Sequence, residues 1–325
     1  MIFDVARHKF SEGLVTLMLF ALVAVFAALR AVDIEVVTDG APLSAVIELF
    51  TISHPVLTAL LMFSMLVYAG LRYARVAVRI GLYSTSTLGL LALGGVAMFA
   101  CTSYSNYLSL MVIVLLGAEL FGRLFYCFGV NMKMSYLFTA MLSLGLMPLV
   151  DSALIPFVLA LSLVVIFIRG TVRETIIILF GLALPTFIYC YLVWLFGGEF
   201  DAAFVDIWQE VNAAVGQEAL VAYMTLSRMV FLGITLLLSI ASLVVYYSVR
   251  VTLVDSSRVV WRLLIALLIM LLAMLFLMPS ASPAIVVILV LVMTLMLPQL
   301  FIRLDVITTS IVYLIWVISA LATLA

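Results

Sequence analysis

Glu119 is a carboxylate well inside a long apolar run, within the stretch VLLGAELFGRLF of residues 114–125. An ionisable side chain at such depth is costly, and it either marks a proton or ion pathway or pairs with a neighbour. The spacing predicts Arg123 as that neighbour, because it follows four residues later on the same helix face, in the favourable acid-before-base order. Two interpretations stay open. One is an ion pair on the helix surface, and the other is a carboxylate that couples proton or ion movement.

Neither a second buried acid nor a clear internal repeat accompanies Glu119, which weighs against an ion-coupled transporter. The elements that carry it must lie in lipid, because the 325-residue chain is 68% hydrophobic and 10% charged. Soluble domains are about half apolar and about a quarter charged. In hydrocarbon, backbone polar groups must be bonded within helices or a closed barrel. The apolar runs are about 17 to 22 residues long and do not alternate, which is typical of helices.

We therefore predict an all-α, polytopic helical membrane protein in which residues 1–325 form a single integral-membrane domain. About eleven transmembrane helices are expected, at 14–32, 55–71, 85–104, 107–124, 135–150, 153–168, 175–196, 229–248, 259–278, 284–302 and 306–324. Short connections rich in Pro and Ser, such as MPLVDSALIP (147–156), separate several of these spans. No small-residue cleavage site follows the charged start, so the first helix is expected to be retained.

The basic residues predict the orientation of the chain. With the N-terminus in the cytoplasm, all but two of the 15 Lys and Arg residues fall on the inner side, as the positive-inside rule requires. An odd number of helices then places the C-terminus in the periplasm of a bacterial inner membrane. The two exceptions are Arg30 and Arg228, at the outer surface. They are either interfacial anchors, whose stems reach up to the headgroups, or functional residues.

The two long connections, 33–54 and 197–228, are both expected on the outer side, and they hold more than half of the 16 acidic residues. The second reads as an amphipathic helix whose apolar face runs from Phe204 to Val215 and lies in the membrane interface. Its acids form either a solvated face or the wall of a substrate site. The same outer segments are the place where a protein partner would bind.

The first outer segment contains a second short helix. Pro42 and Ser44 are expected to start it, and it runs through Glu48. Pro55 then opens the next span, at a first-turn position where its missing N–H costs nothing. His54, directly before it, is either a helix cap or a polar group of a site.

We expect no metal, no cofactor and no nucleic-acid partner. The formal charge is −1, and the chain has two histidines. It has no Walker, Gly-x-Ser-x-Gly or Cys-x-x-Cys motif and no pair of histidines at helical spacing. Cys101, Cys127 and Cys190 lie in or beside different apolar segments, so we interpret them as small apolar side chains.

Residues 167–197, FIRGTVRETIIILFGLALPTFIYCYLVWLFG, resemble a family of uncharacterised multi-pass inner-membrane proteins of Bacteroidetes-type bacteria. The shared pattern is an Arg, a second Arg followed by Glu, and a helix with Gly-Leu-x-x-Pro and aromatic residues. The matching positions are Arg169, Arg173, Glu174, Gly181, Leu182 and Pro185. The stretch 54–72 is similar too, although Arg72 and Arg75 stand where that family often has an Asn. The resemblance implies a bacterial inner membrane and no established activity.

The stretch RAVDIE, residues 30–35, is similar to GT-C type glycosyltransferases and polysaccharide polymerases, which carry acids just after the first helix and arginines near the outer surface. This resemblance implies transfer or polymerisation of a lipid-linked sugar at the outer face. A carboxylate would act as general base on an acceptor hydroxyl; the candidates are Asp33, Glu35 and Glu210. Arginine forks and a polar neighbour would bind a polyprenyl-linked phosphate; the candidates are Arg30, Arg228 and His54.

Three functions therefore remain open. A lipid-linked sugar transferase would use the two exceptional arginines and both acidic outer segments. A non-enzymatic membrane subunit or scaffold would use its outer helices to bind a protein partner. A transporter or flippase would use Glu119 and Arg123 within the membrane. Membrane lipid is an expected partner in all three cases.

Overall fold

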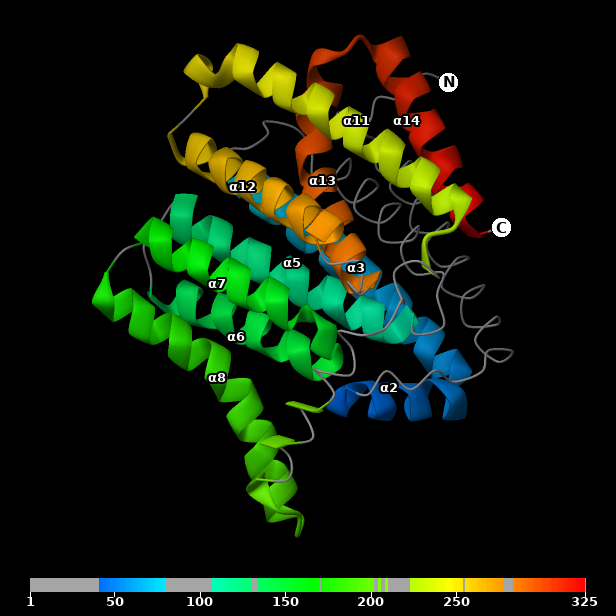
Figure 1. The fold of residues 1–325 in the computed structure, drawn as a ribbon. Coiled ribbons are helices and arrows are strands. Elements are labelled where there is room, and N and C mark those ends of the chain that lie inside the picture. Colours follow the sequence, from blue (N-terminus) through cyan, green and yellow to red (C-terminus); the bar gives the residue numbers. More distant parts are fainter. Residues whose placement is uncertain are drawn as a thin grey trace.

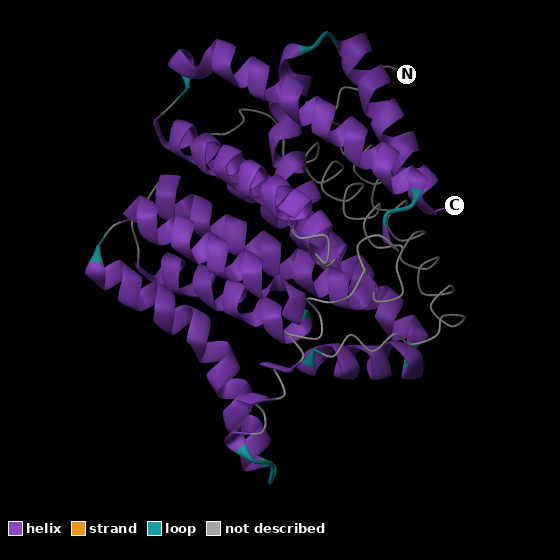
Figure 2. Ribbon diagram, in the orientation of Figure 1, coloured by secondary structure: helices purple, strands orange, loops and turns teal. Residues whose placement is uncertain are grey.

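The fold is that of a computed structural model of the chain. It describes residues 41–79, 107–129, 134–169, 171–201, 204–205, 208–209, 223–253, 255–277 and 283–324. Every regular element in these ranges is helical, as Figure 2 shows. The elements are α2 (Pro42–Ser53), α3 (Pro55–Arg79), α5 (Tyr107–Gly129), α6 (Met134–Val150), η2 (Ser152–Leu154), α7 (Ile155–Arg169), α8 (Val172–Leu195), α11 (Leu226–Val249), η3 (Arg250–Thr252), α12 (Asp255–Leu277), α13 (Pro283–Arg303), α14 (Val306–Leu321) and η4 (Ala322–Leu324).

The all-α membrane class predicted from the composition is confirmed. Within the described ranges, six helices are long and apolar enough to cross a bilayer, namely α3, α5, α8, α11, α12 and α13. The apolar helices α6, α7 and α14 are shorter. Each predicted span in the described ranges coincides with one of these helices, whereas 14–32 and 85–104 lie outside the described residues. The total of eleven therefore stays a prediction.

Helix α13 is the centre of the bundle. Apart from Thr294, Gln299 and the terminal Arg303 it is apolar, and 94% of its span is buried. A helix that is apolar on every side must be covered on every side by protein or by lipid. Here the cover is protein, because α11, α12 and α5 all pack against α13.

The remaining helices are arranged on two sides of this centre (Figure 1). On one side, α3, α5, α6 and α8 pack in that order, each against the next. On the other side, α11 packs against both α13 and α14. Helix α12 lies between the two groups and contacts α5, α7 and α13.

Helix α8 lies at the edge of the bundle, where only 22% of it is buried. It approaches α6 very closely at two glycines. A Cβ added to Gly145 would lie 2.5 Å from the backbone oxygen of Leu182, and one added to Gly181 would lie 2.7 Å from the Cβ of Met141. Small residues that let two backbones approach are the usual contact between helices in lipid.

The short helix predicted after residue 40 is present as α2, and it runs to Ser53, five residues beyond the predicted end at Glu48. It lies across one end of the bundle and packs against α3, α5 and α6 (Figure 1). Its Ser44 and Glu48 are buried, whereas Leu49 and Ile52 are exposed. A helix that turns polar groups to protein and apolar groups outward is suited to a position in the membrane interface.

Candidate functional site

Glu119 lies near the middle of α5, about 18 Å from its start at 1.5 Å per residue. The contact predicted from the sequence is present, since Nε of Arg123 donates a hydrogen bond to Oε2 of Glu119 at 3.2 Å. The two side chains belong to consecutive turns of one helix, so the local sequence alone places them together.

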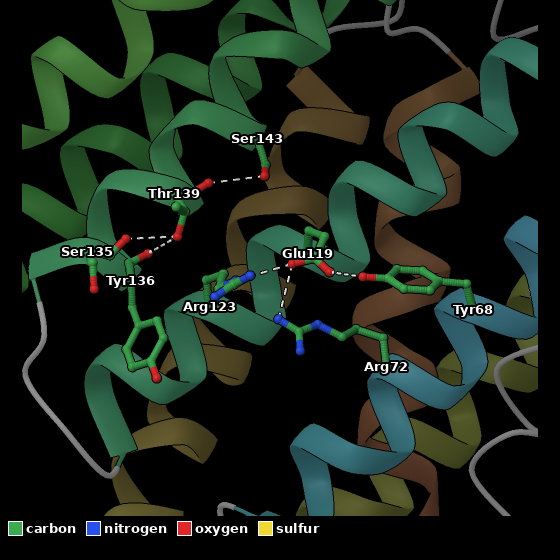
Figure 3. Close-up of polar contacts among 8 residues, drawn as sticks. All are labelled: Tyr68, Arg72, Glu119, Arg123, Ser135, Tyr136, Thr139 and Ser143. Carbon is green, nitrogen blue, oxygen red and sulfur yellow. Dashed lines mark hydrogen bonds and ion pairs between the residues drawn. The ribbon is translucent and has the colours of Figure 1, made fainter.

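Helix α3 supplies two further partners, which Figure 3 shows on the other side of the carboxylate. Nη2 of Arg72 donates to Oε2 of Glu119 at 3.1 Å, and the hydroxyl of Tyr68 donates to Oε1. Tyr68 and Arg72 are four residues apart, so they project from the same face of α3. Both oxygens of Glu119 are therefore bonded, and two guanidinium groups converge on one of them.

The four residues Tyr68, Arg72, Glu119 and Arg123 form what we call the α3–α5 charge cluster. It contains two positive side chains and one negative side chain, hence one positive charge in excess. The side chains are partly enclosed, with exposed fractions of 15% for Arg72, 22% for Glu119 and 34% for Arg123. Nε of Arg72 is buried and has no hydrogen-bond partner in the described part of the chain. Among the described residues, the cluster is thus short of negative charge and of acceptor atoms.

Helix α6 closes the side of the cluster next to Arg123. The guanidinium of Arg123 lies over the ring of Tyr136, 5.8 Å from its centroid, which is a favourable cation–π position. The nearby hydroxyls of Thr139 and Ser143 donate to carbonyl groups of their own helix (Figure 3). These hydroxyls do not bond to the carboxylate of Glu119. Helix α6 therefore contributes the aromatic ring of Tyr136 to the cluster and no further charge.

The predicted outer site is described only in part. Arg30, Asp33, Glu35 and Glu210 lie outside the described residues. Arg228 is buried in the first turn of α11, where Nη1 donates to the carbonyl oxygen of Tyr223 at 2.7 Å. Its guanidinium also lies over the ring of Tyr223, 4.2 Å from the centroid. Arg228 is therefore held against Tyr223, in the segment that leads into α11.

His54 occupies the junction between α2 and α3. Its backbone N–H donates to the carbonyl of Phe50, and its own carbonyl accepts from Thr58. The imidazole is exposed and meets the ring of Phe50 edge to face, at 5.6 Å between centroids. These contacts are those of a residue that ends one helix and begins the next, which is one of the two roles expected for it.

Glu174, Gly181 and Pro185, from the motif in residues 167–197, have structural roles, whereas Arg173 is exposed. The hydroxyl of Thr171 donates to Oε2 of Glu174 at 2.7 Å and accepts from its backbone N–H at 3.4 Å, at the start of α8. The Thr171 hydroxyl thus caps the start of α8 by accepting from one helix-start donor, the N–H of Glu174, while the Glu174 carboxylate accepts from that hydroxyl. Gly181 and Pro185 lie buried on the face of α8 that meets α6. Within the described ranges, no three His, Cys, Asp or Glu side chains gather as metal ligands.

The described helices and the α3–α5 charge cluster together define a polytopic helical membrane protein with ionisable groups inside its spans. Comparison of the chain with protein-family models, curated proteins and solved structures finds no match. The function must therefore be inferred from the geometry of the cluster.

Two members of the cluster, Tyr68 and Arg72, were not predicted from the sequence as site residues. A signal for them exists in the spacing. Tyr68 lies about 20 Å from the start of α3 and Glu119 about 18 Å from the start of α5, at 1.5 Å per residue. If both helices begin at the same surface, as the predicted orientation requires, the two side chains are at the same depth.

Proposed function

We propose that the protein is a membrane transport protein whose substrate pathway passes the α3–α5 charge cluster. The observation that carries the proposal is that Glu119, halfway along a span, is held by Arg72 and Arg123 at once. Ionisable residues within spans are rare, and they commonly mark a substrate or ion path. Glu119 would release and re-form these ion pairs as the substrate passes.

The composition of the cluster supports a pathway better than a purely structural role. One arginine would be enough to neutralise Glu119 and to join α3 to α5. Arg72 is the last residue of the apolar span of α3, and Arg123 lies within the last two turns of that of α5, so two positive side chains facing each other there are costly unless water, a headgroup or an anion reaches them. The partial exposure of all three charged side chains is compatible with such access.

The lipid-linked sugar transferase remains a prediction. It requires Arg30 and Arg228 to lie together, and of these two only Arg228 is described. A docking role for the outer helices likewise stays a prediction. No described contact favours either of them over transport, whereas the charge cluster has a direct use in transport.

Cysteine accessibility tests the pathway without knowledge of the substrate. The full chain, with its three cysteines replaced by Ala, receives Tyr68→Cys and is reconstituted into lipid vesicles. A membrane-impermeant sulfonated maleimide is applied from the outer or the inner side. Because the thiolate is the reactive form and needs a polar surrounding, we expect modification from both sides in turn.

Leu237→Cys is the matched control, because Leu237 is exposed in the middle of α11 among apolar residues and should face hydrocarbon. We expect this thiol to react only after the membrane is dissolved. If Tyr68→Cys reacted from one side only, or behaved like Leu237→Cys, no pathway would cross the membrane at the cluster and the transport proposal would fail.

A further inference from the structure

The arrangement of the two arginines identifies the kind of group that completes the cluster. Each guanidinium carries five N–H donors. In the described contacts, Arg72 and Arg123 each donate a single hydrogen bond to Glu119. Their donor atoms converge on a single oxygen at 3.1 and 3.2 Å, so one small anion with several oxygens could touch both. Such planar forks match carboxylate and phosphate, and of these two a phosphate offers more acceptor oxygens.

Glu119 occupies the place that this anion would take. Its carboxylate supplies two oxygens and a negative charge between Arg72 and Arg123, as two oxygens of a phosphate would. The carboxylate cannot fully neutralise two arginines, and the buried Nε of Arg72 is left without an acceptor in the described part of the chain. A phosphodiester would bring a full negative charge and further acceptor oxygens.

The surroundings favour a lipid as the carrier of the phosphate. Tyr68, at the edge of the cluster, is 48% exposed, and the neighbouring exposed side chains of α3 include Leu60 and Leu71. A lipid could lay its acyl chains on this apolar face while its phosphate reaches the arginines. At 1.5 Å per residue, Arg72 and Arg123 are each about 10 Å from the end of their helices, within reach of one headgroup layer.

We infer that Arg72 and Arg123 form a binding site for the phosphate of an anionic membrane lipid, and that Glu119 closes this site when the lipid is absent. The inference rests on the proposed function in one respect: the bound lipid is a transported substrate only if the cluster lies on a transport pathway. It makes a prediction of opposite sign for the acid and for the arginines. Removing Glu119 strengthens lipid binding, and removing either arginine weakens it.

The experiment uses the full chain in phosphatidylcholine discs that contain a minor fraction of phosphatidylglycerol. Native mass spectrometry measures the phosphatidylglycerol that stays bound to the released protein. We expect Glu119→Gln to raise this occupancy about tenfold, and Arg72→Gln and Arg123→Gln each to lower it about tenfold. Arg262→Gln is the matched control, because Arg262 is an exposed arginine of α12 outside the cluster, and it should behave as the wild type.

A further variant separates loss of the site from loss of the fold. Arg72→Lys keeps the charge opposite Glu119 but lacks the planar fork, so it should remain folded and retain less phosphatidylglycerol than the wild type. Retention equal to the wild type in Arg72→Lys would overturn a phosphate site of this geometry. An unchanged occupancy in Glu119→Gln would overturn the closing role of the acid.

A second arm distinguishes the source of the phosphate. Inorganic phosphate is titrated into protein in pure phosphatidylcholine discs, and thermal stability is followed. Stabilisation that depends on Arg72 and Arg123 would assign free phosphate as the ligand and overturn the lipid. The cysteine test is independent of both arms. If Tyr68→Cys reacts with the maleimide but phosphatidylglycerol is not selectively retained, the transport proposal holds and the lipid inference fails. If phosphatidylglycerol is retained but Tyr68→Cys does not react, the cluster is a static lipid site and the transport proposal fails.

Discussion

At the scale of residues, the members of the α3–α5 charge cluster are not equivalent. Glu119 is the single acid to which the other three side chains bond, and two of those three are positive. Its removal leaves two arginines close together without a counter-charge. Removal of one arginine leaves a neutral pair, because Glu119 keeps the other. Replacing Glu119 is therefore expected to lower the free energy of unfolding more than replacing one arginine.

The stability of substituted proteins tests this asymmetry. We expect Glu119→Gln to lower the free energy of unfolding by about 1 kcal/mol more than Arg123→Gln, a value kept small because the side chains are partly exposed. Thermal unfolding in a neutral detergent measures the difference. The double variant Glu119→Gln with Arg123→Gln should recover part of the loss, since only one positive charge remains. A double variant with simply additive losses would show that the arginines do not repel each other.

Half of this cluster could be predicted from the sequence. The pair Glu119 and Arg123 lies within one helix, where a separation of four residues fixes the contact. Tyr68 and Arg72 reach the same carboxylate only because α3 packs beside α5, and no local pattern specifies which helices are neighbours. The shared depth of Tyr68 and Glu119 narrows the choice of partner, yet it depends on both helices starting at the same surface.

At the scale of elements, the positions and types of the described helices follow from the sequence, and their packing does not. Pro55 and Pro283 begin α3 and α13, and the predicted break near 151 is the short element η2. Helices α8 and α13 both carry long apolar stretches, yet α13 is enclosed by protein and α8 lies at the edge. Lipid chains are as apolar as a protein core, so hydropathy cannot separate the two situations.

The contact of α8 with α6 is the element-scale feature most open to a test. Gly181→Ala would place a Cβ 2.7 Å from the Cβ of Met141 and 3.1 Å from the carbonyl oxygen of Phe138. We expect it to destabilise the protein by about 1 to 3 kcal/mol, because the two helices must separate. Unfolding by SDS in mixed micelles measures the loss, and Gly145→Ala should act in the same direction.

Gly233→Ala is the control for the glycine prediction. A Cβ added to Gly233, in α11, meets nothing within 4 Å, so this variant should gain about 1 kcal/mol at most from helix propensity. If Gly181→Ala were as stable as Gly233→Ala, close approach of the backbones would not hold α8 in place, and its contact with α6 would have to rest on other side chains.

At the scale of the whole molecule, the bundle is built around α13, and the cluster lies in the group of helices that packs on one side of it. Helix α5 connects the two features, because it contacts α13 and also carries Glu119. A shift of α3 against α5 could therefore be transmitted to α13, at the centre of the bundle, through α5 alone. This connection gives the cluster a route by which bound lipid could change the arrangement of the whole bundle.

The orientation of the bundle decides which leaflet supplies that lipid. The positive-inside rule predicts that the ends of α3 and α5 that follow Arg72 and Arg123 lie in the cytoplasm. Alkaline phosphatase fused after Thr171 should then be inactive, and the same enzyme fused after Gly197 should be active, because it folds only in the periplasm. A fluorescent protein at the same two positions should give the opposite pattern. Since α8 alone separates these sites, the result does not depend on the total number of spans. An active fusion after Thr171 with an inactive one after Gly197 would invert the molecule and move the lipid site to the outer leaflet.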